Sequence, residues 1–260
     1  MPLNVSNDVA EPARPVAIVT GAGSGIGRAV ARALYDAGYD LALAGRRTSA
    51  LDETAARMHG AGAVLTLAAD VTNAASVAAL FDQTRERFGR LDLLFNNAGV
   101  SAPDVPLDEL PVERLLAVFN VNLIGATLCA RQAFRLMKAQ TPQGGRIINN
   151  GSVSAYAPRP NNAPYAAAKH GITGLTKSLI LDGRPFNIVC SQIDIGNTAT
   201  EMSAKMTTGA KQADGRIALE PRFDVVHVAQ TVVTMAGLPI EANMPFVTIM
   251  ASGMPLYGRG

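Results

Sequence analysis

The amino-acid sequence predicts an α/β protein with a doubly wound parallel sheet of about seven strands and helices on both faces. One observation behind this prediction is that, from Pro15 onward, short β-rich runs alternate with longer segments whose apolar residues recur at helical spacing. A second is that a glycine-rich turn, residues 21–27, joins the first such run to the first helical segment. Regular alternation implies parallel strands, because each helical crossover returns the chain to the same direction.

The predicted strands are short and mostly apolar, as expected for strands that are buried on both faces of a parallel sheet. In chain order they are Val16–Thr20, Leu41–Ala44, Ala63–Ala68, Leu91–Phe95, Arg146–Asn149, Asn187–Ile193 and Phe246–Met250. The segments between them have apolar residues three and four positions apart, so that one face of each helix can cover the sheet. The predicted helices include Ile26–Ala37, Ala74–Phe88, Val112–Ala139 and Pro164–Asp182.

No linker-like stretch interrupts the alternation, and we therefore expect a single domain over residues 15–260. Residues 1–14 contain two acidic residues, two prolines and no apolar run, which predicts a flexible N-terminal arm rather than a signal peptide or membrane anchor. Residues 197–221 have no steady hydrophobic period and follow a strand, where open α/β sheets bind ligands. We expect a substrate loop that closes over the site, the alternative being a surface loop without a role.

Composition and charge argue against several function classes. The 23 basic and 21 acidic residues leave a net charge of +2, which gives no electrostatic reason to expect nucleic acid or a membrane as a partner. No segment approaches the roughly 20 uninterrupted apolar residues of a membrane span, which favours a cytoplasmic location. Cys129 and Cys190 lie in apolar segments and are expected to be buried thiols. The three histidines are far apart, so no metal site is expected.

The turn after the first predicted strand leads straight into a helix and reads Thr20-Gly21-Ala22-Gly23-Ser24-Gly25-Ile26-Gly27. Glycine lets the backbone turn tightly and approach a pyrophosphate, and the following helix presents free N–H groups to the anion. Strand, glycines and helix in this order at the front of a βαβ unit predict a dinucleotide-binding site.

The end of the second predicted strand bears on which nicotinamide dinucleotide is bound. An NAD site usually has an acidic residue there, which bonds the ribose 2′-hydroxyl. This chain instead has Gly45, Arg46 and Arg47. A guanidinium suits a 2′-phosphate, so NADP(H) is expected in preference to NAD(H), which is the alternative cofactor. The competing interpretation is that Arg46 and Arg47 are only solvated charges at the start of a helix.

Tyr165 and Lys169 lie four residues apart in an alanine-rich helical segment. Residues at this spacing share a helix face, so the phenol and the ammonium can point to one place. A nearby cation could lower the pKa of the phenol, which is about 10 in isolation and too high for acid/base work at neutral pH. Alone the pair could also be a chance occurrence. His170 points elsewhere and is interpreted as a packing or surface residue.

These motifs, together with Asn96-Asn97-Ala98-Gly99, Asn122 and Ser152, resemble the short-chain dehydrogenase/reductase family, and the resemblance covers roughly residues 15–250. The glycine spacing is similar to that of the compact, single-domain branch. The resemblance implies a Rossmann-type fold and NADP(H)-dependent hydride transfer between the nicotinamide and a carbonyl or secondary alcohol. It also implies a small-molecule substrate and a homodimer or homotetramer.

The resemblance further implies catalytic roles for Asn122, Ser152, Tyr165 and Lys169. Tyr165 would be the acid/base, Ser152 would hold the substrate oxygen, and Asn122 would connect a water to Lys169, its alternative role being purely structural. Ser154 competes with Ser152 and ranks lower. The cofactor-binding residues implied are Gly21, Ala22, Gly23, Ser24, Gly25, Ile26, Gly27, Arg46, Asp70, Val71, Asn97, Ala98, Gly99, Tyr165, Lys169, Ile195, Gly196, Thr198 and Thr200.

One segment departs from the family pattern. Ile195 stands where a proline is usual, which adds an N–H and frees φ, and Asp194 precedes it. The Asp194 carboxylate could face the substrate pocket or cap the turn. The residues expected near substrate are Ala155, Tyr156, Asp194, Ile195 and the loop of residues 199–218. They are mixed in polarity and favour a small or medium polar carbonyl. Two alternatives to net hydride transfer stay open here: an internal redox step such as epimerisation, and a non-catalytic NADP(H)-binding redox sensor.

Overall fold

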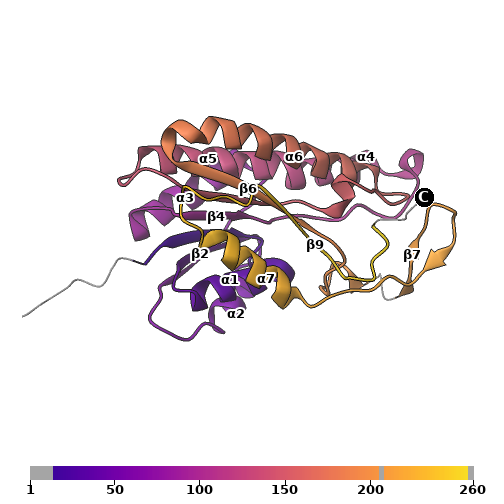
Figure 1. Ribbon diagram of the computed structural model, residues 1–260, viewed down its shortest axis with the longest axis horizontal. Coiled ribbons are helices and arrows are strands. Elements are labelled where there is room, and N and C mark those ends of the chain that lie inside the picture. The colour runs from indigo at the N-terminus through magenta and orange to yellow at the C-terminus, as the bar shows by residue number, and fades with distance from the viewer. Residues whose placement is uncertain (1–13, 205–207, 257–260) are drawn as a thin grey trace, which may run out of the picture.

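The computed structural model describes residues 14–204 and 208–256, in which one central sheet lies between two layers of helices (Figure 1). The predicted arm lies outside the described residues except for Arg14, whose Nε is 3.3 Å from the Asp40 carboxylate. The rest of the chain follows the predicted alternation of strands and helices.

The sheet has seven strands in the order β3-β2-β1-β4-β5-β6-β9, and every neighbouring pair is parallel. This confirms the predicted fold class. The strands are β1 (Val16–Thr20), β2 (Asp40–Gly45), β3 (Val64–Ala68), β4 (Leu93–Asn96), β5 (Gly145–Asn150), β6 (Ile188–Ile195) and β9 (Phe246–Ile249). A separate antiparallel pair, β7 (Ala210–Lys211) and β8 (Ile217–Ala218), lies within the predicted substrate loop.

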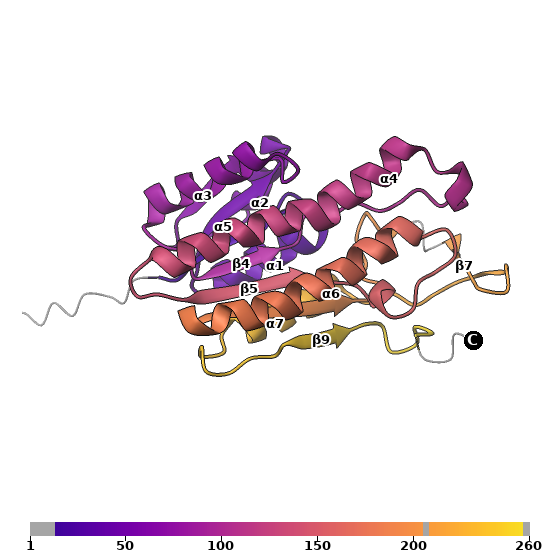
Figure 2. The ribbon, with the colours of Figure 1, turned by 90° about the horizontal axis from the view of Figure 1, so that it is seen from above.

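The helices are divided between the two faces of the sheet, as Figures 1 and 2 show. The main helices are α1 (Gly25–Asp36), α2 (Thr48–Ala55), α3 (Ala74–Phe88), α4 (Val112–Phe119), α5 (Ala126–Ala139), α6 (Ala163–Gly183) and α7 (Val225–Ala236). Short 3₁₀ turns occur at η1 (Leu107–Glu109), η3 (Val153–Ala155) and η4 (Arg184–Phe186). On one face α1 packs against α7, and on the other α5 packs beside α3 and α6.

Each face of the sheet has its own hydrophobic core. On one side Val19 and Leu43 of the sheet pack against Leu34 of α1 and Val232 of α7. On the other side Ile18, Leu94 and Ile147 belong to a cluster with residues of α3 and α5. Neighbouring residues of one strand therefore serve opposite cores, which is why these strands are apolar throughout rather than alternating.

The predicted helix Val112–Ala139 is continuous but not uniform. Between α4 and α5 the segment η2 (Asn120–Gly125) is a π-helix, a feature that is frequent at functional sites. The run is long enough to cross a membrane, and an 18-residue window of it has a mean hydropathy of 1.4, which sequence analysis did not anticipate. Its residues Cys129, Ala133 and Met137 belong to the core beneath the sheet, so packing within the domain accounts for part of this apolar character.

The strand order places a topological switch between β1 and β4. The chain leaves β1 toward β2 and β3 and later returns to β4 on the other side of β1. Loops from the two halves separate above this point, and ligands of open α/β sheets bind in the resulting crevice. The fold therefore directs attention to the carboxyl ends of β1 and β4.

Candidate active site

A cavity of about 750 Å³ opens at the carboxyl ends of the central strands. Of the predicted cofactor-binding residues, all except Ala22 and Lys169 line it, and so does Ser152. Lys169 and Asn122 are buried next to the cavity rather than in its wall. Residues that are far apart in sequence thus converge on one site, as the motifs predicted.

The glycine turn has the backbone shape that an anion cradle requires. Gly21 and Gly25 have φ of 67° and 50°, in the left-handed region that glycine adopts readily. A Cβ on Gly27 would lie 2.2 Å from the Gly21 carbonyl oxygen, so the helix can approach the turn only without a side chain. No side chain caps the start of α1 at Ser24, which leaves its N–H groups for a ligand. The turn therefore fits a dinucleotide pyrophosphate.

Ala22 differs from its neighbours in the turn. It is fully buried, and its N–H donates to the Ala44 carbonyl at 3.1 Å. This hydrogen bond ties the turn to the end of β2. Ala22 thus shapes the cradle without forming part of the cavity wall.

The far end of the cavity carries positive charge. Arg46 and Arg47 are exposed and both line the cavity after Gly45, with no acidic residue at the end of β2. Asp70 stands opposite, and its carboxylate accepts hydrogen bonds from the Thr72 N–H (2.9 Å) and hydroxyl (2.8 Å). These bonds, helped by the Arg46 charge, lower the pKa of Asp70. A phosphate beside Arg46 would meet a cation, while the carboxylate stays ionised.

In the middle of the cavity wall, the side-chain amides of Asn97 and Asn150 form hydrogen bonds that join the ends of three strands. Asn97 donates to the Thr20 carbonyl through Nδ2 (2.9 Å), and its N–H donates to the Thr20 hydroxyl (2.8 Å). Asn150 in turn donates to the Asn97 Oδ1 at 2.8 Å. The Thr20 hydroxyl also accepts from the Ala98 N–H at 3.0 Å. The ends of β1, β4 and β5 are thereby fixed relative to one another along the predicted cofactor channel.

Ser152 and Tyr165 meet at the wall of the cavity. Ser152 follows β5, its Oγ accepts from the Ser154 N–H at 3.1 Å, and its hydroxyl lies close enough to the Tyr165 hydroxyl to act on the pKa of the tyrosine. Burial raises the pKa of Tyr165, while the Ser152 hydrogen bond and the charge of Arg159 act in the opposite direction. Ser154 has its hydroxyl turned to Asn162 at 3.5 Å, so Ser152 is the serine paired with the tyrosine.

Lys169 lies one helical turn below Tyr165. Its Nζ donates to the Asn150 carbonyl at 2.6 Å and is 5.6 Å from the centre of the Tyr165 ring. Burial lowers the pKa of Lys169 to about 8, although the negative charge of Asp194 raises it. The sequence led us to expect a phenol pKa lowered by the ammonium. In the structure burial raises the pKa of Tyr165, and the charge that acts against this rise is that of Arg159, not Lys169. Burial also lowers the pKa of Lys169 itself.

The sequence profile of one protein family, described as short chain dehydrogenase, matches residues 15–211. The chain belongs to the short-chain dehydrogenase family. It is therefore an NAD(P)-dependent oxidoreductase of alcohol or carbonyl groups. The family assignment favours an enzyme over a purely non-catalytic sensor.

Two curated relatives and one solved structure illustrate the likeness. The chain is 36% identical over 213 residues to cis-4-hydroxycyclohexanecarboxylate dehydrogenase of Sinomonas cyclohexanicum, covering 79% of this chain and 84% of the relative. It is 34% identical over 206 residues to a 3beta-hydroxysteroid dehydrogenase of Mediterraneibacter gnavus, covering 79% and 74%. A single-residue variant of actinorhodin polyketide ketoreductase, solved with NADPH, aligns with a TM-score of 0.80 at 27% identity, covering 91% and 95%.

In this short-chain dehydrogenase, Asn122 faces the loop after β4. Its Oδ1 accepts from the Val100 N–H at 2.9 Å, and its Nδ2 donates to the Val100 carbonyl at 2.8 Å. A Cβ on Gly99 would approach Asn122 Oδ1 to 2.9 Å, which explains the glycine beside it. The side chain thus supports the predicted structural role of Asn122, and the water relay to Lys169 stays a prediction.

The loop after β6 forms another part of the cavity wall. Ile195, Gly196, Thr198 and Thr200 all line the cavity. The N–H that Ile195 has in place of the usual proline lies within a strand, since β6 continues to Ile195 and pairs there with Ile249 of β9. The segment that departs from the family pattern thus forms the end of β6, and the next residue, Gly196, donates its N–H to the Ile249 carbonyl at 2.9 Å.

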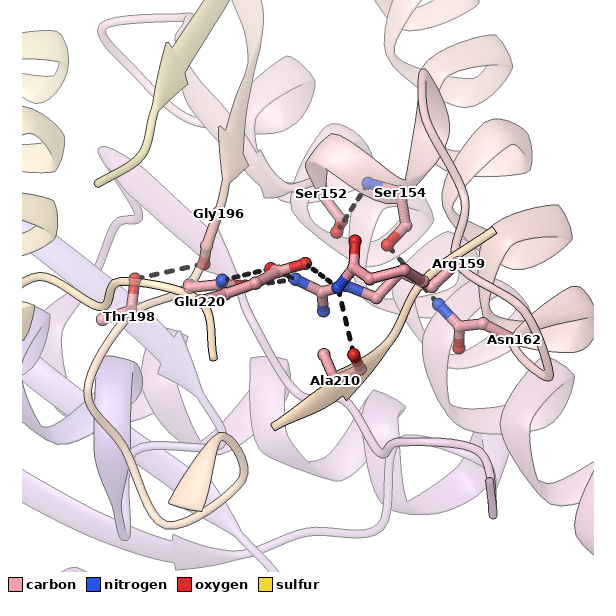
Figure 3. A network of polar contacts seen from close by, with 10 residues as sticks. Ser152, Ser154, Arg159, Asn162, Gly196, Thr198, Ala210 and Glu220 are labelled. Atoms are coloured by element: carbon pink, nitrogen blue, oxygen red, sulfur yellow. Dashed lines mark hydrogen bonds and ion pairs between the residues drawn. The ribbon is translucent and has the colours of Figure 1, made fainter. Parts of the chain in front are cut away.

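Sequence reasoning missed the residues that anchor the predicted substrate loop. Arg159 and Glu220 form an ion pair, and Glu220 also accepts from Asn197 Nδ2 (2.7 Å) and Gln212 Nε2 (3.0 Å). Figure 3 shows Glu220 reaching Arg159, which comes from the opposite side. The partners lie 61 residues apart in the chain, and no motif marks either one. The predicted substrate loop is thus tied to the segment before α6 at the cavity wall.

The remaining wall surrounds the space beyond Ser152 and Tyr165. It is formed by Ser101, Ala102, Asp104, Ser154, Asn161, Asn162, Met202 and Lys211, among others. Asn161 Nδ2 donates to Asp104 at 2.9 Å and so joins two of these loops. Ala155 and Tyr156, which the sequence placed near substrate, do not line the cavity. The wall is mixed in polarity, as predicted.

Proposed function

We propose that this enzyme transfers a hydride between NADP(H) and a ketone or secondary alcohol, with Tyr165 as the proton donor or acceptor. The observation that carries the proposal is that Ser152 and Tyr165 lie together at the wall of a cavity that also contains the glycine cradle. A carbonyl oxygen placed between the two hydroxyls would find a hydrogen-bond donor in Ser152 and a proton in Tyr165.

When bound, the nicotinamide supplies or accepts the hydride. The residues of this chain then manage the proton and the charge. In the reduction, Tyr165 gives its proton to the substrate oxygen, and Ser152 stabilises the negative charge that develops there. Lys169 places a buried positive charge beside the phenol and offers donors to a ribose hydroxyl. Asn122 holds the loop that follows the cofactor channel.

The substrate class follows from the relatives and the cavity together. Two relatives are named for hydroxyl groups on a cyclohexanecarboxylate and a steroid. The cavity beyond Tyr165 is mixed in polarity and includes Lys211 and Ser154. We infer that a ring-bearing ketone or secondary alcohol is the substrate. The test is a panel of cyclohexanones, including 4-oxocyclohexanecarboxylate, and steroid ketones, followed by NADPH consumption and identification of the alcohol formed. NADPH binding without turnover on the whole panel would contradict the proposal.

We also propose that the enzyme forms a homodimer or homotetramer. Leu116 of α4, Ile124 of η2 and Leu181 of α6 are large apolar residues that are 50%, 48% and 59% exposed. Such side chains on neighbouring helices are suited to a contact between subunits. Light scattering of the purified protein measures the oligomeric state directly, and a monomer at micromolar concentration would contradict this proposal.

Arg46→Ala is expected to weaken NADPH binding about tenfold or more while leaving NADH binding nearly unchanged, because a charge-assisted bond to the 2′-phosphate is lost. Titration followed by nicotinamide fluorescence measures both dissociation constants. Arg47→Ala is the matched control, since it removes the same charge from the neighbouring position of the cavity wall. Equal losses for NADPH and NADH, or a loss only in the control, would show that Arg46 does not select the cofactor.

The rate of carbonyl reduction is expected to fall as pH rises through about 8, the pKa of Lys169. The sign follows because a lysine is charged below its pKa, and because Tyr165, whose pKa is raised, keeps its proton at that pH. The profile of kcat/KM for NADPH reports groups of the free enzyme and is the measurement. The Lys169→Met variant should reduce the carbonyl slowly at all pH values, and its pH profile should lack the alkaline limb, that is, the fall in rate near pH 8. If the rate of the wild type fell only above the ordinary pKa of a phenol, about 10, the ionisation would instead be that of Tyr165, whose pKa is raised.

A further inference from the structure

Asp194 is a buried carboxylate next to the proposed site that sequence analysis left without a definite role. It lies neither in the substrate pocket nor at the cap of a turn. Its side chain belongs to β6, the residue is 0% exposed, and it is absent from the cavity wall. Burying a charged group is costly unless it is hydrogen-bonded or paired, so its partners indicate what it does.

Three donors surround the carboxylate. Oδ1 accepts from the Ser152 N–H at 2.9 Å and from Gln192 Nε2 at 2.8 Å, and Oδ2 accepts from the Tyr156 hydroxyl. The Gln192 amide is oriented by a second bond, because the Thr176 hydroxyl donates to its Oε1 at 3.0 Å. A carboxyl group that only accepts hydrogen bonds has the pattern of the ionised form.

The carboxylate holds both ends of the segment that carries Ser152. The Ser152 N–H is at one end, the Tyr156 hydroxyl is at the other, and the 3₁₀ turn η3 lies between them. A Cβ on Gly151 would lie 2.0 Å from Asp194 Oδ1, so the carboxylate packs directly beneath the backbone that leads into Ser152. The position of the Ser152 hydroxyl next to Tyr165 therefore depends on a backbone that Asp194 fixes.

The charge of Asp194 also acts on the buried ammonium of Lys169. The Lys169 Nζ donates to the Asn150 carbonyl at 2.6 Å, and the N–H of Ser152, two residues further along the chain, donates to Asp194. Burial lowers the pKa of Lys169 to about 8, and Asp194 is the charged group that raises it. Tyr165 is the ionisable neighbour on α6, and Arg159, from the segment before α6, acts on Tyr165. Removing the Asp194 charge would therefore make Lys169 lose its proton at a lower pH.

We propose that Asp194 is a positioning residue of this active site, which anchors the backbone of Ser152 and balances the buried charge of Lys169. The proposal rests on the proposed function for the roles of Ser152 and Lys169. Its two effects are separable, because Tyr156 contributes only to the anchoring.

The test compares Asp194→Asn with Tyr156→Phe. Asparagine keeps the shape and an acceptor for Ser152 but removes the charge, whereas phenylalanine keeps the charge and removes one hydrogen bond. Asp194→Asn is expected to lower kcat for carbonyl reduction about tenfold and to move the alkaline limb to lower pH by about one unit. Tyr156→Phe is expected to lower kcat less than about fivefold and to leave the limb in place. Asp182→Asn, an exposed carboxylate at the end of α6, should change neither.

Failure of the proposed function gives a different result from failure of this proposal. If the wild type reduces no carbonyl, the pH dependence of NADPH affinity still reports the Lys169 ammonium, and Asp194→Asn should weaken binding from a lower pH than the wild type. If the pH profiles of both turnover and NADPH binding in Asp194→Asn were the same as in the wild type, the proposal would be overturned. Equal losses of kcat in the two variants with no movement of the limb would leave only a structural role and would also overturn it. A thermal melt shows that each variant is folded.

Discussion

Tyr165→Phe is expected to lower kcat for carbonyl reduction by about 10²–10⁴-fold, the range that general acid–base catalysis contributes. Phenylalanine keeps the ring beside Lys169 but removes the hydroxyl that lies next to Ser152 and that, in the proposed function, exchanges a proton with the substrate. NADPH binding should change by less than about threefold, because the glycine cradle and Arg46 are untouched. Steady-state kinetics and fluorescence titration on the same preparation measure both quantities.

The matched control for this variant is Tyr39→Phe. This substitution also removes a tyrosine hydroxyl. In the wild type that hydroxyl donates to the Ala236 carbonyl at 3.4 Å, away from the cavity wall. Its kcat should match that of the wild type. If Tyr165→Phe retained most of its activity, the proton would have to come from another group. If NADPH binding vanished together with turnover, the effect would lie in cofactor binding rather than in proton transfer.

Gly27→Ala is expected to be the most damaging single-methyl change in the cofactor site. The added Cβ would lie 2.2 Å from the Gly21 carbonyl oxygen and 2.7 Å from Asn97 Nδ2. The first of these atoms belongs to the backbone, so α1 and the glycine turn must move apart. Overpacking of this kind costs about 1–3 kcal/mol, and we expect NADPH affinity to fall at least about tenfold because the turn no longer fits the pyrophosphate.

The control is Gly174→Ala, the same change in α6 at a position where a Cβ would meet nothing within 4 Å. That variant should be as stable as the wild type or more stable by about 0.5–1 kcal/mol, since alanine favours a helix over glycine. Thermal unfolding and NADPH titration distinguish the two variants. Wild-type affinity in Gly27→Ala would mean that the turn does not bind the cofactor.

The sequence was sufficient for the parts of the site that depend on local backbone shape. The glycine turn requires left-handed φ at Gly21 and Gly25, which few other residues tolerate, and its place between strand and helix is visible in the pattern. Helical periodicity likewise placed Tyr165 and Lys169 on one face. Buried parallel strands are continuous apolar runs, so the strands and their order along the chain could also be predicted.

Other parts depended on which distant residues the fold brings together. Gln192 and Asp194 share a face of β6 because side chains alternate along a strand. The pairing of β6 with β5 and β9 decided that this face meets α6 and Ser152 rather than the cavity. The ion pair of Arg159 with Glu220 joins segments 61 residues apart, and no local pattern encodes it.

The protonation behaviour of the catalytic pair also belongs to the tertiary structure. Spacing alone suggested an ammonium that lowers the phenol pKa. A pKa depends on burial and on every nearby charge, and burial by surrounding helices raises that of Tyr165 and lowers that of Lys169. The sequence thus determined the glycine turn and the shared helix face of Tyr165 and Lys169, because turns and helix faces are local. The fold decided their hydrogen bonds and charges, because those are set by neighbours distant in the chain.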